Sequence, residues 1–375
     1  MVNVARLPQG VRARAKGGYE KRFTVEGVRY SVYGATPKEC MKKETEKRQA
    51  IAAGTYTKNN AVTFGEYFAE WCEMKAKQVK GATLLNYTTC YNKHLDKVLG
   101  RCKVQKIERR QIVQIQQRVA EMHGVSTGNR AKLVISMVLE NAVLDGIITA
   151  NPADHIPQLK REGRKITETT HKALSAQEIT DFLAGSKESW YYNAFRFMLA
   201  TGVRCGECGA LEPRDIDYKA NVIHIRRTVT RDVSGKWILG DTPKTAHSCR
   251  VIPMNAEIRA ILNEQMKYNN MMFGIALDKP IFRSERGGLM NTSTANSFIR
   301  YKVTQLNKQG KEIHMFSVHA LRDTFATMAA RKHVPMNVLK ELLGHASYQM
   351  TADRYAQVYE EEKQEVMKGL SILEA

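Results

Sequence analysis

The sequence lacks several features that would place it in other classes of protein. No stretch approaches the roughly 18 consecutive apolar residues of a membrane-spanning helix, and no signal peptide opens the chain. Its 7 cysteines are an odd number scattered along 375 residues, which argues against a disulfide framework and predicts reduced thiols in the cytoplasm. Neither a P-loop nor a paired-carboxylate signature stands out, which argues against an ATPase and a two-metal nuclease.

Positive charge, by contrast, is abundant. The chain has 58 Lys and Arg against 38 Asp and Glu, a net charge of +20, and a pI of about 9.6. Such an excess predicts a polyanionic partner, and nucleic acid is favoured over an anionic membrane surface. The length predicts about two or three domains.

Residues 1–58 form a strongly basic segment, with 13 Lys and Arg against 5 Glu. Alternating residues at 23–25 and 28–32 flank Glu26-Gly27, a pattern that predicts a β-hairpin, and a further strand is expected near 11–15. Thr36-Pro37-Lys38-Glu39 reads as a capping box and predicts a helix that runs to about Ala53.

A small basic sheet of this kind can enter a DNA groove. The alternative is a solvated basic face with no specific role. The candidate DNA contacts in this segment are Arg12, Arg14, Arg22 and Arg29.

Residues 62–158 show an all-helical pattern. Thr63 and Glu66 form a second capping box, helices are expected at about 82–95, 109–122 and 126–145, and Trp71 is expected in the core. For each basic residue of this segment, a solvated face is the alternative to a phosphate contact. The candidate contacts are Lys75, Lys77, Lys80, Lys93, Lys97, Arg130 and Lys132.

Residues 159–172 are polar and predict a linker. A third capping box at Ser175 opens the next domain, with a helix expected over 190–200 and strands at about 222–227, 237–239 and 250–253. The tail at 360–375 carries five Glu and two Lys, and its apolar residues Val366, Leu370 and Leu373 have helical spacing. This composition favours docking onto a protein surface.

Four side chains between His319 and Tyr355 are hard to explain by packing alone. His319 and Arg322 are three residues apart, so they share a face of a helix. A helix over 338–343 is expected to end at a glycine that His345 follows directly, and Tyr355 comes ten residues later. Arginine and histidine can bind a phosphate, and the hydroxyl of a tyrosine can attack one.

These segments resemble the tyrosine recombinases, the integrases of phages and conjugative elements. The resemblance rests on HALRDTFAT at 319–327, LLGH at 342–345 and Tyr355. LATGVRCGE at 199–207 resembles the first arginine box of the family, and TPKT at 242–245 resembles its hairpin lysine. The catalytic positions of the family all have a match, in the family's order, and the similarity is closest to integrases with an extra N-terminal DNA-binding domain.

The resemblance implies a role for each matched residue. The two arginines would bind the non-bridging phosphate oxygens, and the lysine would protonate the leaving 5′ oxygen. The first histidine would accept the tyrosine proton or orient the phosphate, the second would donate to a phosphate oxygen, and the tyrosine would be the nucleophile. The implied catalytic residues are Arg204, Lys244, His319, Arg322, His345 and Tyr355, with Glu207 orienting the site.

Other interpretations of these residues are weaker. Cys205 and Cys208 form a CxxC pair, but zinc usually needs a second pair, and a redox pair would need a βαβ setting. Lys236 is a rival for the hairpin lysine, and Tyr348 and Tyr359 are rivals for the nucleophile without the spacing of the family. At the level of function, the rivals are a type IB topoisomerase and a catalytically silent DNA-binding regulator.

The predicted fold class is therefore multidomain, mainly α with small β-sheets (α+β). The predicted segments are an arm-site DNA-binding domain at 1–58, a helical core-binding (SAM-like) domain at 62–158, a linker at 159–172, a catalytic domain at 173–359, and a tail at 360–375 that docks on a neighbouring protomer or on its own domain. The implied activity is site-specific DNA recombination without metal, ATP or another cofactor.

The resemblance also implies partners and a location. The expected partners are double-stranded DNA at core and arm sites, a tetramer of this chain on two duplexes, and an excisionase or DNA-bending protein. The expected location is the nucleoid in the cytoplasm of a bacterial host, with no membrane partner.

Overall fold

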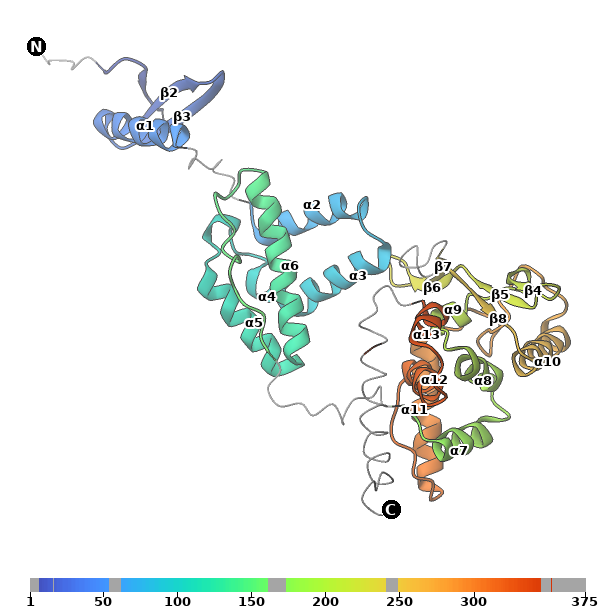
Figure 1. Ribbon diagram of the computed structural model, residues 1–375. Coiled ribbons are helices and arrows are strands. Elements are labelled where there is room, and N and C mark those ends of the chain that lie inside the picture. The colour runs from blue at the N-terminus through green and yellow to red at the C-terminus, as the bar shows by residue number, and fades with distance from the viewer. Residues whose placement is uncertain are drawn as a thin grey trace, which may run out of the picture. The chain divides into compact units, whose positions relative to one another are not determined.

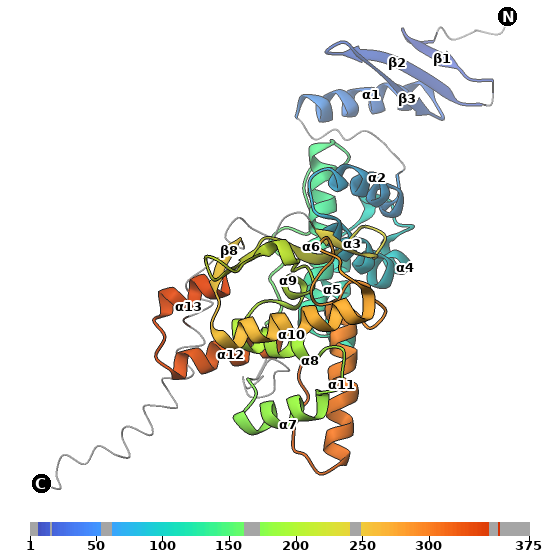
Figure 2. The ribbon, with the colours of Figure 1, turned by 90° about the vertical axis from the view of Figure 1, so that its right-hand side faces the viewer.

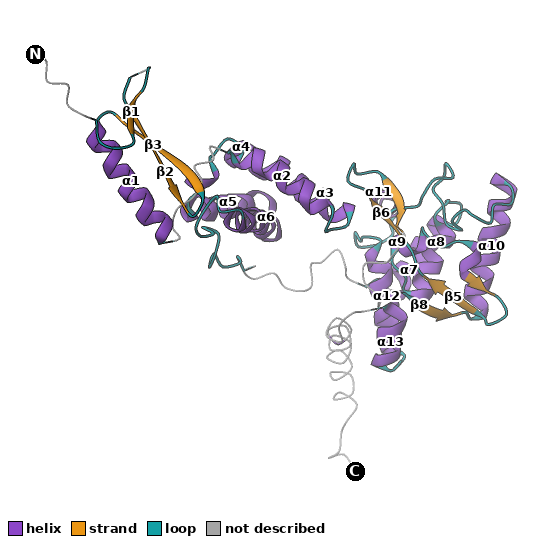
Figure 3. Cartoon of the chain, turned by 90° about the horizontal axis from the view of Figure 1, so that it is seen from above, coloured by secondary structure: helices purple, strands orange, loops and turns teal. Residues whose placement is uncertain are grey.

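The computed structural model describes residues 7–15, 17–53, 62–160, 173–240, 249–344 and 352 (Figure 1). The chain divides into two compact units, Met1–Val79 with Asn86–Arg161 and Lys80–Leu85 with Glu162–Ala375. Helices are the main element and the sheets are small and antiparallel, which confirms the predicted fold class (Figure 3). Within the described ranges, no helix is long and apolar enough to span a bilayer.

The N-terminal element is a three-stranded sheet with one helix. Its strands are β1 (Val11–Ala13), β2 (Tyr19–Val25) and β3 (Val28–Gly34), in the order β1-β2-β3, and α1 spans Pro37–Ala52. The predicted hairpin is confirmed, because β2 pairs with β3 and both turn residues, Glu26 and Gly27, have positive φ as a type I′ turn requires.

Local signals also explain where α1 begins. The Thr36 side chain accepts a hydrogen bond from the Glu39 N–H, and the Glu39 carboxylate accepts one from the Ala35 N–H. The predicted start of this helix is therefore confirmed. Its end is confirmed too, because α1 ends at Ala52 and Ala53 is the C-cap.

The helical part of the first unit packs around aromatic side chains. Its elements are α2 (Phe64–Ala76), the second half of α3 (Gly81–Cys90, whose residues up to Leu85 belong to the second unit), the π-helical turn η1 (Tyr91–Leu95), α4 (Asp96–Leu99), the 3₁₀ turn η2 (Val104–Lys106), α5 (Arg109–His123) and α6 (Val125–Leu144). Trp71 is 2% exposed, which confirms it as core, and Phe68 stacks on Tyr91 with ring centroids 4.0 Å apart. The capping box at Thr63 forms in full.

The second unit is also mainly helical. Its helices are α7 (Ala176–Ser186), α8 (Tyr192–Thr201), α9 (Cys205–Cys208), the 3₁₀ turn η4 (Pro213–Asp215), α10 (Ala256–Phe273), α11 (Thr292–Lys308), α12 (His319–Arg331) and α13 (Met336–Leu343). Helix α8 packs against both α10 and α12. The capping box at Ser175 forms in full, as predicted.

Two small sheets complete this unit. One has the order β4-β5-β8, from β4 (Ile216–Asp217), β5 (Val222–Ile225) and β8 (Arg250–Pro253), and the other pairs β6 (Thr228–Arg231) with β7 (Trp237–Gly240). The strand expected over 222–227 begins as predicted but ends earlier, at Ile225. Neither β4 nor β6 was predicted. Arg227 explains the early end, because its guanidinium binds the buried carboxylates of Glu212 and Asp215.

Candidate active site

The first arginine box begins where α8 ends. Gly202 caps this helix in the left-handed conformation, with φ +67°, and a Cβ there would lie 2.4 Å from Cδ1 of Phe325. Glycine is therefore required both by the backbone and by the close approach of α12. The tight turn leads directly to Arg204, which is the N-cap of α9.

Glu207 binds both the backbone and the side chain of Arg204. One carboxylate oxygen accepts from the Arg204 backbone N–H at 2.9 Å, and the other accepts from Arg204 Nη1 at 2.8 Å. The Glu207 side chain is only 3% exposed, whereas that of Arg204 is 36% exposed. The arginine is thus anchored by a buried group and remains accessible to a ligand.

The second arginine, Arg322, is buried within α12. It is 3% exposed and donates from Nη1 to the Gly202 carbonyl at 2.8 Å and from Nη2 to the Leu343 carbonyl at 2.6 Å. These two carbonyls end α8 and α13, so one side chain joins three helices. Each amino group of a guanidinium carries two hydrogens, so these bonds leave a second hydrogen on each nitrogen.

Arg250 is a third arginine at this site; it follows the motif of the hairpin lysine in the sequence, but the resemblance implied no role for it. Its Nη2 lies 2.8 Å from Glu207 Oε2, and its Nε donates to the Leu342 carbonyl at 2.6 Å. A sequence signal did exist, because strand residues alternate between faces and Arg250 shares the inward side of β8 with the buried Ile252. A charged residue at a core-facing strand position indicates a buried ion pair.

Positive charge exceeds negative charge around these residues. Burial would raise the pKa of Glu207, but Arg250 and Arg204 hold it below its ordinary value, so the carboxylate is ionised. Burial and the nearby Arg204 lower the pKa of Arg322 to about 9, which leaves it protonated near neutrality. Arg204, Arg250 and Arg322 therefore outnumber the two buried carboxylates that act on them, those of Glu207 and Asp323. Glu207 pairs directly with Arg204 and Arg250, and the remaining positive charge favours binding of an anion.

The other predicted catalytic residues are only partly described. His319 is exposed at the first turn of α12, three residues before Arg322 on the same helix. Helix α13 ends at Gly344 in the left-handed conformation, as expected. Lys244, His345 and Tyr355, together with the rivals Tyr348 and Tyr359 and the whole tail, lie outside the described residues. The rival Lys236 is exposed in the turn between β6 and β7.

The two cysteines of the CxxC pair serve as core residues. Cys205 and Cys208 are buried in the same cluster as Phe197 and Ile223. Burial raises the pKa of Cys205 to about 12 and that of Cys208 well above its ordinary value. Neutral, buried thiols are unsuited to metal binding and to redox chemistry, both of which use the thiolate.

The four candidate arginines of the N-terminal sheet share one face. In the register Arg12 lies opposite Glu20 and Arg22 opposite Ser31, and alternation places Arg14 and Arg29 on that same side. Helix α1 covers the other face, where Lys21 pairs with Glu44. All four arginines are exposed, and Tyr33 lies among them beneath Arg14, whose guanidinium is 4.7 Å from the ring centroid.

The candidate basic residues of the helical segment lie at the end of α2, in the turn that follows it, and on α6. Lys77, Lys80 and Arg130 are exposed, whereas Lys75 is half-buried and lies 5.9 Å from the ring centroid of Trp71. Arg130 and Lys132 are two positions apart on α6, so they point to different sides of the helix.

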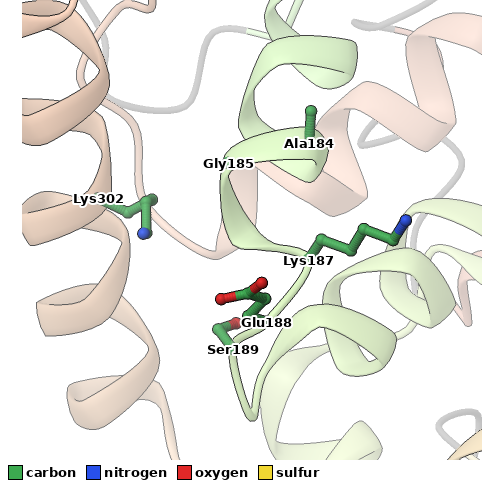
Figure 4. A pocket seen from close by; sticks show the side chains of 6 residues that line it. All are labelled: Ala184, Gly185, Lys187, Glu188, Ser189 and Lys302. Carbon is green, nitrogen blue, oxygen red and sulfur yellow. The ribbon is translucent and has the colours of Figure 1, made fainter.

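A cavity of about 340 Å³ lies elsewhere, beside α7 and α11 (Figure 4). It is lined by Ala184, Gly185, Lys187, Glu188, Ser189 and Lys302. No predicted catalytic residue is among them, so this cavity is separate from the arginine cluster.

Comparisons with known proteins agree with the resemblance noted in the sequence. A model described as phage integrase family matches residues 170–362, and one described as phage integrase, N-terminal SAM-like domain matches residues 63–120. A tyrosine recombinase XerC-like protein of Caldanaerobacter subterraneus is 26% identical over 371 residues, covering 92% of each chain. The ICEBs1 integrase of Bacillus subtilis is 23% identical over 363 residues, covering 94% of each chain.

Solved structures share the fold. The Tn1549 transposon integrase in complex with transposon right end DNA has a TM-score of 0.67 and 21% identity, over 82% of this chain and 100% of that one. A lambda integrase tetramer bound to a Holliday junction has a TM-score of 0.59 and 18% identity, over 91% of this chain and 96% of that one.

Proposed function

Given that the chain belongs to the phage integrase family of tyrosine recombinases, we propose that it integrates and excises a mobile genetic element through a 3′-phosphotyrosyl intermediate. One observation carries the proposal. Glu207 pairs with Arg204 and Arg250, the buried Arg322 lies close enough to Arg204 to lower its own pKa, and the three arginines outnumber the buried carboxylates of Glu207 and Asp323, which leaves positive charge beside the accessible guanidinium of Arg204. A phosphodiester passing through a charged transition state needs such donors.

The proposed reaction uses only side chains of this protein. The Tyr355 oxygen attacks the phosphorus, the bond to the 5′ oxygen breaks, and Lys244 supplies the proton that this leaving oxygen takes up. His319 accepts the tyrosine proton or orients the phosphate, and His345 donates to a phosphate oxygen. Arg204 and Arg322 neutralise the non-bridging oxygens, and Glu207 orients Arg204. The phosphotyrosyl ester keeps the energy of the broken bond, so rejoining needs no ATP.

Adduct formation with chelator present tests this function. We expect the full-length protein, mixed with nicked duplexes from the element's ends, to form a covalent adduct at the same rate in excess EDTA and without ATP, because cationic side chains take the place of a metal. A gel shift that survives denaturation measures the adduct. Loss of the adduct in EDTA, with recovery in magnesium, would contradict the mechanism.

We propose that each segment of the chain has a separate function. We assign arm-site DNA to 1–58, core-site DNA to the helical segment at 62–158, and strand cleavage to 173–359, with 159–172 as the linker. The shared face of Arg12, Arg14, Arg22 and Arg29 supports the first assignment, since strands can enter a DNA groove. Lys75, Lys77, Lys80, Arg130 and Lys132 remain proposed phosphate contacts of the helical segment.

The N-terminal sheet offers a test with a matched control. We expect the double variant Arg12→Gln/Arg29→Gln to weaken binding to arm DNA about tenfold or more and to reduce the salt slope by about 2, about one per lost phosphate contact. Cleavage at core sites should be unchanged. Fluorescence anisotropy over a salt series measures both quantities.

The control removes the same charge elsewhere in the same element. Lys38 and Lys42 are exposed on α1, which covers the opposite face of the sheet. Lys38→Gln/Lys42→Gln should keep most of the affinity for arm DNA. Equal losses in the two double variants would mean that only net charge matters and that the arginine face is not a specific contact surface.

We further propose that protomers assemble as a tetramer on two duplexes, and that the acidic tail at 360–375 docks on a neighbouring protomer. The structural neighbour described as a tetramer on a Holliday junction supports this assembly. An excisionase or DNA-bending protein is the proposed accessory partner, and the bacterial nucleoid the proposed location.

A single substitution in the tail tests the docking. Leu370→Glu places a charge on the apolar stripe of Val366, Leu370 and Leu373, so we expect reduced higher-order complexes and strand exchange, with single-site DNA binding kept. Mass photometry beside a recombination assay measures this. Gln364→Glu adds the same charge off the stripe and should have little effect. Unchanged assembly in Leu370→Glu would refute docking, and unfolding of the free protein would indicate packing within the protomer.

A further inference from the structure

We infer that Arg250 is a positioning residue of the proposed cleavage site. It holds Glu207 behind Arg204 and ties that carboxylate to the C-terminal end of α13, from which the chain continues to His345. This inference rests on the proposed function, because it assigns Arg250 a part in preparing the site for the scissile phosphate. Neither the motif match nor the spacing of the catalytic residues pointed to this role.

Arg204 and Arg250 share the carboxylate of Glu207. Its Oε1 pairs with Arg204 Nη1 at 2.8 Å, and its Oε2 pairs with Arg250 Nη2 at 2.8 Å. Oε2 also accepts from the Arg204 backbone N–H. Arg250 therefore fixes the plane of a carboxylate whose other oxygen sets the direction of the Arg204 guanidinium.

The two arginines that bind Glu207 differ in burial. The Arg250 side chain is 5% exposed and the Glu207 side chain 3%, whereas Arg204 is 36% exposed. Of the two arginines on this carboxylate, only Arg204 is open enough to meet a phosphate from DNA. Arg250 must act through its neighbours, and without it Glu207 would retain a single and more mobile charged partner.

Arg250 also binds the C-terminal end of α13. The last carbonyls of a helix have no partner within the helix, and they carry a partial negative charge. Arg250 Nε donates to the Leu342 carbonyl and Arg322 Nη2 to the Leu343 carbonyl, so two buried cations cap consecutive residues. Strand β8 and α13 lie side by side, which brings Arg250 to this end of the helix (Figure 2).

Together these contacts make Arg250 a link between two parts of the site. One part is the arginine box with Arg204 and Glu207, and the other is the helix end that precedes His345. A lysine keeps the charge but has one nitrogen, so it cannot bind Glu207 and the Leu342 carbonyl in the two directions that the guanidinium serves. A small displacement of a catalytic group costs up to about 10²-fold in rate.

The test compares cleavage of two substrates by the full-length protein. Arg250→Lys and Arg250→Met are mixed in excess with nicked duplexes whose scissile group is either a phosphate or a neutral methylphosphonate. Rates of adduct formation are normalised to the protein fraction that binds DNA, so partial unfolding does not enter the comparison. Arg214→Lys, which alters the ion pair between the exposed Arg214 and the buried Glu212 in the same unit, is the control.

We expect both Arg250 variants to cleave the phosphate substrate at least about tenfold more slowly, with DNA affinity within about threefold of the wild type. On the methylphosphonate the loss should shrink, because a neutral group places less demand on the orientation of Arg204. A purely structural role would slow both substrates equally.

Equal losses on the two substrates would overturn the inference, as would wild-type rates in both variants. Failure of the wild-type protein to form any adduct would instead count against the proposed function, so the two failures are distinguishable. Arg214→Lys should match the wild type on both substrates.

Discussion

Tyr355→Phe is expected to bind its DNA as tightly as the wild-type protein and to form no covalent adduct. The substitution removes one oxygen, and that oxygen is the proposed nucleophile, while the aromatic ring is kept. Filter binding gives the affinity, and denaturing gels with end-labelled nicked duplexes give the adduct. The expected loss is complete within detection, because the substitution removes the hydroxyl on which the proposed ester forms.

Two neighbouring tyrosines serve as matched controls for this variant. Tyr348→Phe and Tyr359→Phe remove the same atom close by in the sequence, but neither residue lies ten positions after His345. Both should form the adduct at close to the wild-type rate. If Tyr355→Phe formed the adduct and Tyr359→Phe did not, the nucleophile would be Tyr359 and the assignment of Tyr355 would be refuted.

Arg322→Lys should have the second largest effect, a fall in cleavage rate of about 10²–10³-fold with the positive charge retained. Lysine has one nitrogen in place of a planar fork, so it cannot serve the Gly202 carbonyl, the Leu343 carbonyl and a phosphate oxygen together. A carbonyl left without a donor also costs about 1–3 kcal/mol of stability. Single-turnover cleavage and thermal unfolding measure the two effects.

Arg331→Lys is the control on the same helix. Arg331 lies in the last turn of α12 and is exposed, so the same exchange there should leave both the cleavage rate and the melting temperature close to those of the wild type. Arg322→Lys with a lowered melting temperature but a wild-type cleavage rate would show that Arg322 supports the fold alone and takes no part in catalysis.

Signals carried by neighbouring residues were readable from the sequence alone. The starts at Thr36, Thr63 and Ser175 depend on a side chain that meets an N–H three residues later, and the structure confirms all three. The Glu26–Gly27 turn and the end of α13 at Gly344 depend on local backbone conformation. Family motifs likewise identified the arginine box and the helix that carries His319 and Arg322.

Only the tertiary structure shows which residues interact when they are far apart in the sequence. Arg322 donates to carbonyls 120 and 21 residues away, and Arg250 reaches across 43 residues to Glu207 and 92 residues to Leu342. Local patterns show that a strand position faces inward, but they do not say which group it meets there. For the same reason the sequence left the CxxC cysteines open to metal or redox interpretations, until packing placed both thiols in the core, where burial keeps them neutral.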